Sequence, residues 1–143
     1  MKVASKFTIA IHTLLFIYKF DGKMKTTSEN ISKSVGVNPV IIRQVLSDLK
    51  KAGIITVKFG TGGASLSKSL DDVSLLDVYN AVISQDEGLF YFHQNPEAKC
   101  PVGKNIHNVL DEKLDFIKQG FDERLKEVKL SSLTEKLDNL TTE

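Results

Sequence analysis

Residues 38–51 read N-P-V-I-I-R-Q-V-L-S-D-L-K-K, and this stretch predicts the helix around which the fold is organised. Asn38 is a favourable N-cap, because its side chain can accept hydrogen bonds from the first backbone N–H groups. Pro39 suits the first helical position, where no N–H group is needed. Gly53 closes the helix, since glycine accepts the left-handed conformation that ends many helices.

The predicted helix has two faces of different character. Its apolar face is formed by residues spaced three, one and three apart, namely Ile42, Val45, Leu46 and Leu49. The opposite face carries hydrogen-bonding and positively charged side chains, namely Arg43, Gln44, Ser47, Lys50 and Lys51. Such a helix can pack on a core and read a nucleic acid, although the same pattern also fits an ordinary amphipathic surface helix.

The segments before this helix complete a helix-turn-helix. Residues 5–19 are rich in core-type side chains and predict a first helix. A second, short helix follows, capped by Thr27 or Ser28, and a turn at Gly36 connects it to the stretch quoted above. Two helices joined by a short glycine-containing turn are typical of the helix-turn-helix, whose second helix enters the DNA major groove.

The segments after it predict a β-hairpin. Residues 54–59 are rich in β-branched side chains, and their alternating pattern predicts a strand. Residues 60–63 are rich in glycine and predict the loop of a hairpin. Residues 64–67 then return as the second strand. A hairpin in this position is a wing, and its glycines allow the backbone to approach a phosphate closely. A flexible hairpin without a ligand is the alternative.

The second half of the chain predicts three further helices. Ser74 and Asp77 form a capping box for a helix over residues 75–83. Residues 89–92 are expected to form a short aromatic strand or an extended piece that is buried against that helix. A long helix over about 102–129 follows, and a second capping box, Ser132 with Glu135, is expected to start a short final helix. We therefore expect a winged helix-turn-helix DNA-binding domain over residues 1–84. Residues 85–143 are expected to form a linker, a long dimerisation helix and a short C-terminal helix.

The long helix has an apolar seam that repeats every eleven residues. Its members are Ile106, Leu110, Leu114, Ile117, Phe121, Leu125 and Val128. A seam of this length requires a long partner, and a second copy of the chain would give a twofold dimer. Packing of the seam back onto its own domain is the alternative.

Charge is divided between the two halves. Residues 1–70 carry 11 Lys and Arg against 3 Asp and Glu, whereas residues 71–143 carry 8 against 15. The basic half suggests a polyanionic partner. The single cysteine, and the lack of a secretory signal or an apolar run near 20 residues, predict a cytoplasmic protein without a membrane span.

Together these parts resemble the Rrf-two family of bacterial transcriptional regulators, over roughly residues 1–130. The resemblance rests on residues 26–55, on the G-x-G-G pattern at 60–63, and on S-L-L-D-V-Y-N-A-V at 74–82. It implies a mainly α fold with a small β-hairpin wing, a winged helix-turn-helix followed by a long dimerisation helix. It also implies a homodimer that binds a palindromic operator in double-stranded DNA. On this basis we expect a sequence-specific DNA-binding repressor and no enzymatic activity.

The resemblance also implies which residues contact DNA. Carried over by position, these are Thr27, Ser28, Asn38, Val40, Ile41, Arg43, Gln44 and Lys50, with Lys58, Gly60, Thr61, Gly62 and Gly63 in the wing. The family's wing usually reads R-G-P-G-G, whereas this chain has phenylalanine at residue 59 and threonine at residue 61. Arg43 stands where cluster-binding relatives often carry glutamate, and it is expected to reach guanine O6 and N7.

Cluster-binding relatives hold their metal with three cysteines near the start of the long helix. This region offers only Cys100, with His93 and His107 nearby. Because iron–sulfur clusters are usually held by several thiolates, we expect no cluster, no other metal and no cofactor. The chain therefore resembles a cluster-free branch of the family.

Cys100 precedes Pro101 at the start of the long helix, beside Lys99 and Lys104. Helix N–H groups and positive charge favour a thiolate, so we expect a lowered pKa and an oxidisable sulfur. A sulfenic acid here could be capped by a small thiol or could pair with Cys100 of the partner subunit. A buried, inert cysteine is the alternative.

The leading interpretation is therefore a dimeric DNA-binding regulator that is redox- or electrophile-responsive through Cys100. Two other functional classes are weighed against it. One is a one-cysteine thiol peroxidase, and the other is a protein-interaction module that acts through the acidic half.

Overall fold

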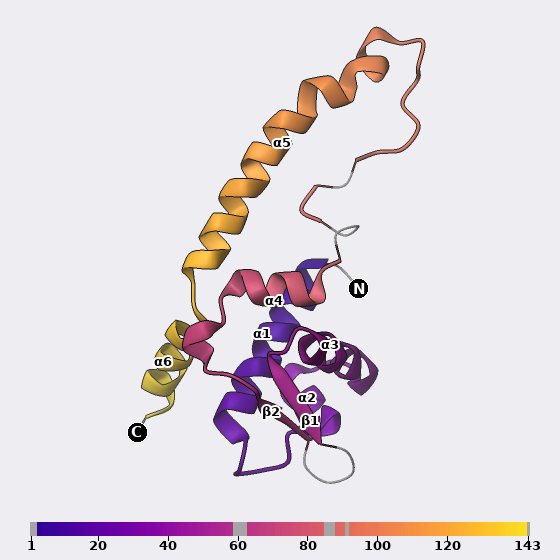
Figure 1. Cartoon of the computed structure of the whole chain (residues 1–143). Helices are drawn as coiled ribbons and strands as arrows, with labels where there is room; N and C mark the ends of the chain where they lie inside the picture. The colour runs from indigo at the N-terminus through magenta and orange to yellow at the C-terminus, as the bar shows by residue number, and fades with distance from the viewer. Residues whose placement is uncertain (1–2, 59–62, 85–87, 91, 143) are drawn as a thin grey trace.

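The computed structural model describes residues 3–58, 63–84, 88–90 and 92–142. The order of elements is α1 (Val3–Phe20), α2 (Ser28–Val35), α3 (Pro39–Lys51), β1 (Ile55–Lys58), β2 (Gly63–Leu66), a 3-10 turn η1 (Leu70–Asp72), α4 (Leu75–Val82), α5 (Pro101–Glu127) and α6 (Leu130–Thr141). Helices α1 to α4, α6 and the hairpin form one body, and α5 projects away from it (Figure 1). The mainly helical fold with a small hairpin is confirmed.

The local signals around α3 are confirmed. The Asn38 side chain accepts a hydrogen bond from the Val40 N–H at 2.9 Å, and Pro39 is the first helical residue. Gly53 has φ +77° and follows the C-cap of α3 in the left-handed conformation. The cap of α2 is Thr27, whose side chain accepts from the Asn30 N–H at 3.3 Å.

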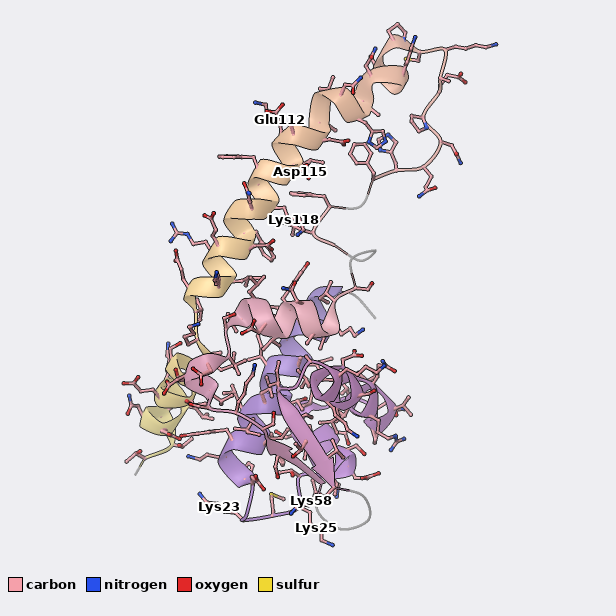
Figure 2. All side chains as sticks on the ribbon, in the orientation of Figure 1. Lys23, Lys25, Lys58, Glu112, Asp115 and Lys118 are labelled. Atoms are coloured by element: carbon pink, nitrogen blue, oxygen red, sulfur yellow. The ribbon has the colours of Figure 1, made fainter. Side chains whose placement is uncertain are left out.

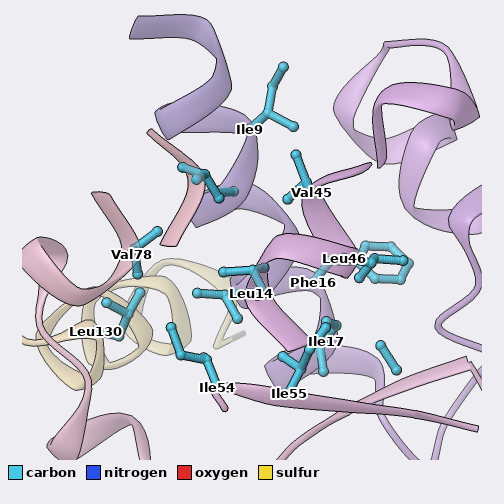
Figure 3. Close-up of a cluster of buried hydrophobic side chains, with 14 of the residues drawn as sticks. Ile9, Leu14, Phe16, Ile17, Val45, Leu46, Ile54, Ile55, Val78 and Leu130 are labelled. Carbon is cyan, nitrogen blue, oxygen red and sulfur yellow. The ribbon is translucent and has the colours of Figure 1, made fainter. Parts of the chain in front are cut away.

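The predicted apolar face of α3 lies in the centre of the body. Ile42, Val45, Leu46 and Leu49 are all buried there. They pack in one cluster with side chains from α1, the hairpin, α4 and α6, including Leu14, Ile17, Ile54, Val78 and Leu130 (Figure 3). Because this face is buried, the opposite face of α3 is turned toward solvent.

The hairpin is held to the segment before α2 as well as to itself. Strands β1 and β2 pair antiparallel, with Ile55 opposite Leu66 and Lys58 opposite Gly63. The predicted return strand 64–67 therefore starts one residue earlier than expected. Gly63 also bridges Thr26, and the Ala64 N–H donates to the Thr26 carbonyl at 3.1 Å. Gly63 has φ +74°, and an added Cβ would lie 2.5 Å from the Thr26 carbonyl oxygen, so only glycine fits.

Helix α6 returns to the body and starts earlier than the sequence indicated. The Leu130 N–H donates to the Val73 carbonyl at 2.8 Å, and the Leu130 side chain is fully buried. This tertiary contact sets the start of α6, so the predicted capping box at Ser132 is wrong. The Ser132 hydroxyl instead donates to the Lys129 carbonyl at 2.6 Å. Asp138 binds α6 to α1, since it accepts from the Tyr18 hydroxyl at 2.5 Å and from Lys19 at 3.2 Å.

Helix α4 begins with the predicted capping box of Ser74 and Asp77. Aromatic contacts then connect it to both neighbours, since Tyr79 lies edge-on to Phe7 and to Phe121, with ring centroids 5.5 and 5.4 Å apart. The C-terminal part of α5 is thereby fixed on the body.

The predicted seam of α5 is divided. Phe121 and Leu125 pack against the core of the same chain. For these two residues, the alternative that the seam packs on its own domain is confirmed. Ile117 remains 51% exposed. A second apolar stripe, Val102, Val109 and Phe116, is 68%, 64% and 75% exposed, and the sequence interpretation missed it.

The aromatic segment before α5 does not lie where it was expected. Leu89 and Phe90 are 39% and 42% exposed, and the described residues of this segment form no strand. The Phe92 ring stacks on His107 of α5, with centroids 4.1 Å apart. For the described residues of this segment, the expected burial against α4 is therefore wrong, and Phe92 packs on α5 instead. No helix in the described part of the chain is long and apolar enough to cross a membrane.

Candidate nucleic-acid interface

A hollow of about 560 Å³ opens between α2, α3 and the hairpin. The start of α2 contributes Thr27, Ser28 and Glu29, the exposed side of α3 contributes Arg43, Ser47 and Lys50, and the hairpin contributes Val57, Lys58 and Gly63. Lys25 and Thr26 close it on the side of the loop before α2. The helix-turn-helix and the wing therefore share one concave surface.

Six of the predicted DNA-binding residues line this hollow. They are Thr27, Ser28, Arg43, Lys50, Lys58 and Gly63. Four others lie on or beside α3 outside it, namely Asn38, Val40, Ile41 and Gln44. The predicted wing residues Gly60, Thr61 and Gly62, with Phe59, lie outside the described residues.

The four residues outside the hollow differ in how free their side chains are. Val40 is 60% exposed, whereas Ile41 is partly buried against the core. Asn38 uses its carbonyl oxygen to cap α3. The Gln44 amide donates to Asp48 at 3.3 Å.

The hollow is strongly basic. Its lining carries four cations, Lys25, Arg43, Lys50 and Lys58, and one carboxylate, Glu29. Lys23, Lys25 and Lys58 gather at one end of the body, whereas Glu112 and Asp115 lie on the projecting α5 (Figure 2). The charge division in the sequence is thus also a division in space, and the basic end can follow a phosphate backbone.

Lys23 and Lys25 were not among the predicted contacts. They lie in the loop before α2, and the Lys25 carbonyl accepts from the Asn30 side chain at 2.7 Å, which ties the loop to α2. Their only signal in the sequence was the basic character of the first half.

Arg43 is held by two residues of α2. Its Nη1 donates to Ser28 Oγ and to Glu29 Oε1, both at 3.4 Å. The backbone N–H of Glu29, the Ser28 hydroxyl and the Arg43 guanidinium lower the pKa of the Glu29 carboxyl. Glu29 is therefore ionised at neutral pH.

Cys100 lies far from this hollow, at the N-cap of α5, and it is exposed. The expected alternative of a buried cysteine is therefore wrong, whereas the reactivity of the thiol stays a prediction. The backbone N–H groups of Gly103 and Val102 lower the pKa of the Cys100 thiol, and neither Lys99 nor Lys104 contributes to that shift.

The residues around Cys100 do not fit an iron–sulfur cluster. The chain has one cysteine. The nearby histidines, His93 and His107, would have to replace thiolates, whereas such clusters are usually held by four cysteines. Within the described ranges no group of three or more His, Cys, Asp or Glu could hold a metal ion.

A helix-turn-helix with a hairpin wing, built around a basic concave surface, defines a winged helix-turn-helix DNA-binding protein. The chain belongs to the Rrf2 family, whose model is described as an iron-dependent transcriptional regulator and matches residues 3–136. It is a DNA-binding transcriptional regulator of this family and not an enzyme.

Similar proteins agree with this assignment. The candidate HTH-type transcriptional regulator YwnA of Bacillus subtilis is 46% identical over 123 residues, which cover 86% of this chain and 90% of YwnA. A solved structure described as a candidate DNA binding protein is 39% identical, with a TM-score of 0.69 over 90% of this chain and 97% of that one. IscR of T. potens shares the fold at 17% identity, with a TM-score of 0.70 over 100% of this chain and 93% of IscR.

Proposed function

We propose that this regulator is a homodimer that binds a palindromic operator and represses transcription by covering promoter DNA. The observation that carries the proposal is the hollow between α2, α3 and the hairpin, where four cations surround the exposed side of α3. In this proposal the N-terminal half of α3 enters the major groove, with Arg43 and Gln44 reading bases. Lys25, Lys50 and Lys58 contact phosphates, which gives affinity without sequence preference.

The exposed stripe on α5 supports the dimer. Val102, Val109 and Phe116 recur every seven residues, so they lie on one side of the helix two turns apart. Burying an aromatic or aliphatic side chain of this kind stabilises an interface by about 1.5–3 kcal/mol per residue. A second copy of the chain offers the same stripe, which makes a twofold contact self-complementary.

Cys100 supports a redox response. Its thiolate would attack one oxygen of a peroxide, the O–O bond would break with hydroxide leaving, and the sulfur would be oxidised to a sulfenic acid. A small thiol would then condense with it, releasing water and leaving a mixed disulfide at the start of α5. We infer that this group disturbs the dimer contact at Val102 and changes the spacing of the two α3 helices.

We further propose that the chain works in the cytoplasm without an iron–sulfur cluster. One thiolate is too few for the cysteine ligation that such clusters usually have, although the family description names iron.

Salt dependence tests the proposed DNA contact. Binding to duplex DNA from upstream of the protein's own gene, measured by fluorescence anisotropy, is expected to weaken steeply with salt, because bound phosphates release counterions. Lys58→Ala should reduce the slope of log K against log salt by about 2 in a dimer, at about 0.9 for each lost contact. Lys136→Ala on α6 is the matched control and should leave the slope unchanged. A slope near zero for the unmodified protein would contradict the proposed function.

A further inference from the structure

We propose that Glu29, together with Ser28, is a positioning residue that orients the Arg43 guanidinium for a guanine and so sets one base preference of the operator. This inference rests on the proposed role of Arg43 in reading bases. It assigns a specificity role to α2, the helix that precedes the reading helix.

The geometry leaves one edge of the guanidinium available. Ser28 and Glu29 both accept from Nη1 of Arg43, at 3.4 Å each, and the Ser28 hydroxyl donates to Glu29 Oε2 at 3.2 Å. A guanidinium carries five N–H donors in a rigid planar fork. Fixing Nη1 therefore fixes the direction of Nη2 and Nε, and these two nitrogens can donate together to guanine N7 and O6.

The contact between Arg43 and Glu29 adds little to the stability of the fold. The Arg43 and Glu29 side chains are 54% and 63% exposed, and exposed ion pairs contribute little to folding. Replacing Glu29 should therefore leave the fold intact, which makes its effect on DNA binding interpretable.

The charge of Glu29 also opposes non-specific binding. Its carboxylate lies in a hollow with four cations, on the surface that faces the DNA in the proposed complex. A negative charge there repels phosphates, and it partly neutralises Arg43 as a phosphate ligand. Glu29 would thus lower the affinity of the protein for any duplex. It would also hold the Arg43 guanidinium in the orientation that suits one base. Specificity is then gained at a cost in affinity.

A double-mutant cycle in the full-length protein tests this inference. The four proteins are the unmodified chain, Glu29→Ala, Arg43→Ala and the double variant. Each is titrated against the operator, against operators with each base pair substituted symmetrically in both half-sites, and against an unrelated duplex. The guanine in question is the base pair at which Arg43→Ala removes the preference of the unmodified protein.

We expect Glu29→Ala to reduce the preference for that guanine by roughly tenfold, within the range of a good bidentate contact. Affinity for the unrelated duplex should rise several-fold. In the Arg43→Ala background, Glu29→Ala should no longer change any base preference. Glu29→Gln, which keeps an acceptor at Oε1 without the charge, should restore most of the preference.

Asp21→Ala is the control for bulk charge, because it removes one exposed carboxylate from the loop before α2 without touching Arg43. It should leave every base preference unchanged. If Glu29→Ala strengthens binding to all duplexes equally, or changes base preference equally with and without Arg43, the positioning role is overturned. If Arg43→Ala alone leaves all preferences intact, the base-reading role of Arg43 fails instead, while DNA binding by the unmodified protein still stands.

Discussion

Replacing Phe116 with glutamate is expected to convert the protein into a monomer and to weaken operator binding by about 100-fold or more. Phe116 is 75% exposed and belongs to the same stripe as Val102 and Val109. In a twofold dimer the substitution places two carboxylates in an apolar contact, where each lacks a partner. Without the dimer, the second half-site no longer adds to the affinity of the first.

Sedimentation and anisotropy measure the two effects separately. Because Phe116 is so exposed in the single chain, far-ultraviolet circular dichroism and thermal stability of the variant should change little. Asn108→Glu adds the same charge to α5 away from the stripe, and it should remain dimeric and bind normally. A Phe116→Glu protein that still sediments as a dimer would disprove the proposed interface, and a monomer of undiminished affinity would disprove the need for it.

Oxidation of Cys100 is expected to release the operator. Peroxide followed by a small thiol should dissociate the complex of the unmodified protein, and a strong reductant should restore binding. Since the Gly103 and Val102 N–H groups lower the pKa of this thiol, its reaction with peroxide should reach half its maximal rate at a lower pH than that of a free thiol. Stopped-flow mixing across pH, with mass spectrometry of the product, measures this reaction.

Cys100→Ser is the matched variant, because serine keeps the size and the N-cap position but cannot form a disulfide. It should bind the operator normally and stay bound under the same treatment. The redox proposal fails if Cys100→Ser releases DNA in the same way, or if the modified unmutated protein stays bound.

The parts of the fold that local signals determine could be predicted from the sequence. Asn38 caps α3, Gly53 ends it, and Ser74 with Asp77 starts α4, since each signal acts within a few residues. The buried face of α3 followed from periodicity alone. These predictions were sufficient to place α3 and the two strands of the hairpin, and the reading of bases by α3 stays a prediction.

The parts that depend on distant contacts could not be predicted in the same way. The start of α6 depends on hydrogen bonding between Leu130 and Val73, so the local capping signal at Ser132 was misleading. The apolar repeat on α5 correctly marked Phe121 as a packing residue but could not indicate that Tyr79 of the same chain covers it.

In the candidate site, too, single residues could be predicted from the sequence but the contacts between them could not. The sequence indicated Ser28 and Arg43 as separate contacts, and their shared partner Glu29 was not suspected. A residue at the start of α2 meets a residue in the middle of α3 only because the turn between them brings the two helices together. Lys25 lines the hollow because its carbonyl accepts a hydrogen bond from the Asn30 side chain of α2, and the sequence did not indicate this contact either.

Selection of bound sites from a random duplex pool, using the reduced full-length protein and sequencing of the recovered DNA, is the most direct measurement. We predict an inverted repeat whose half-sites are separated by about one helical turn of DNA or a multiple of it, with a guanine in each half that disappears when Arg43→Ala is used for the selection. Recovery of no common sequence, or of a single site without inverted symmetry, would contradict a twofold regulator that reads DNA with α3.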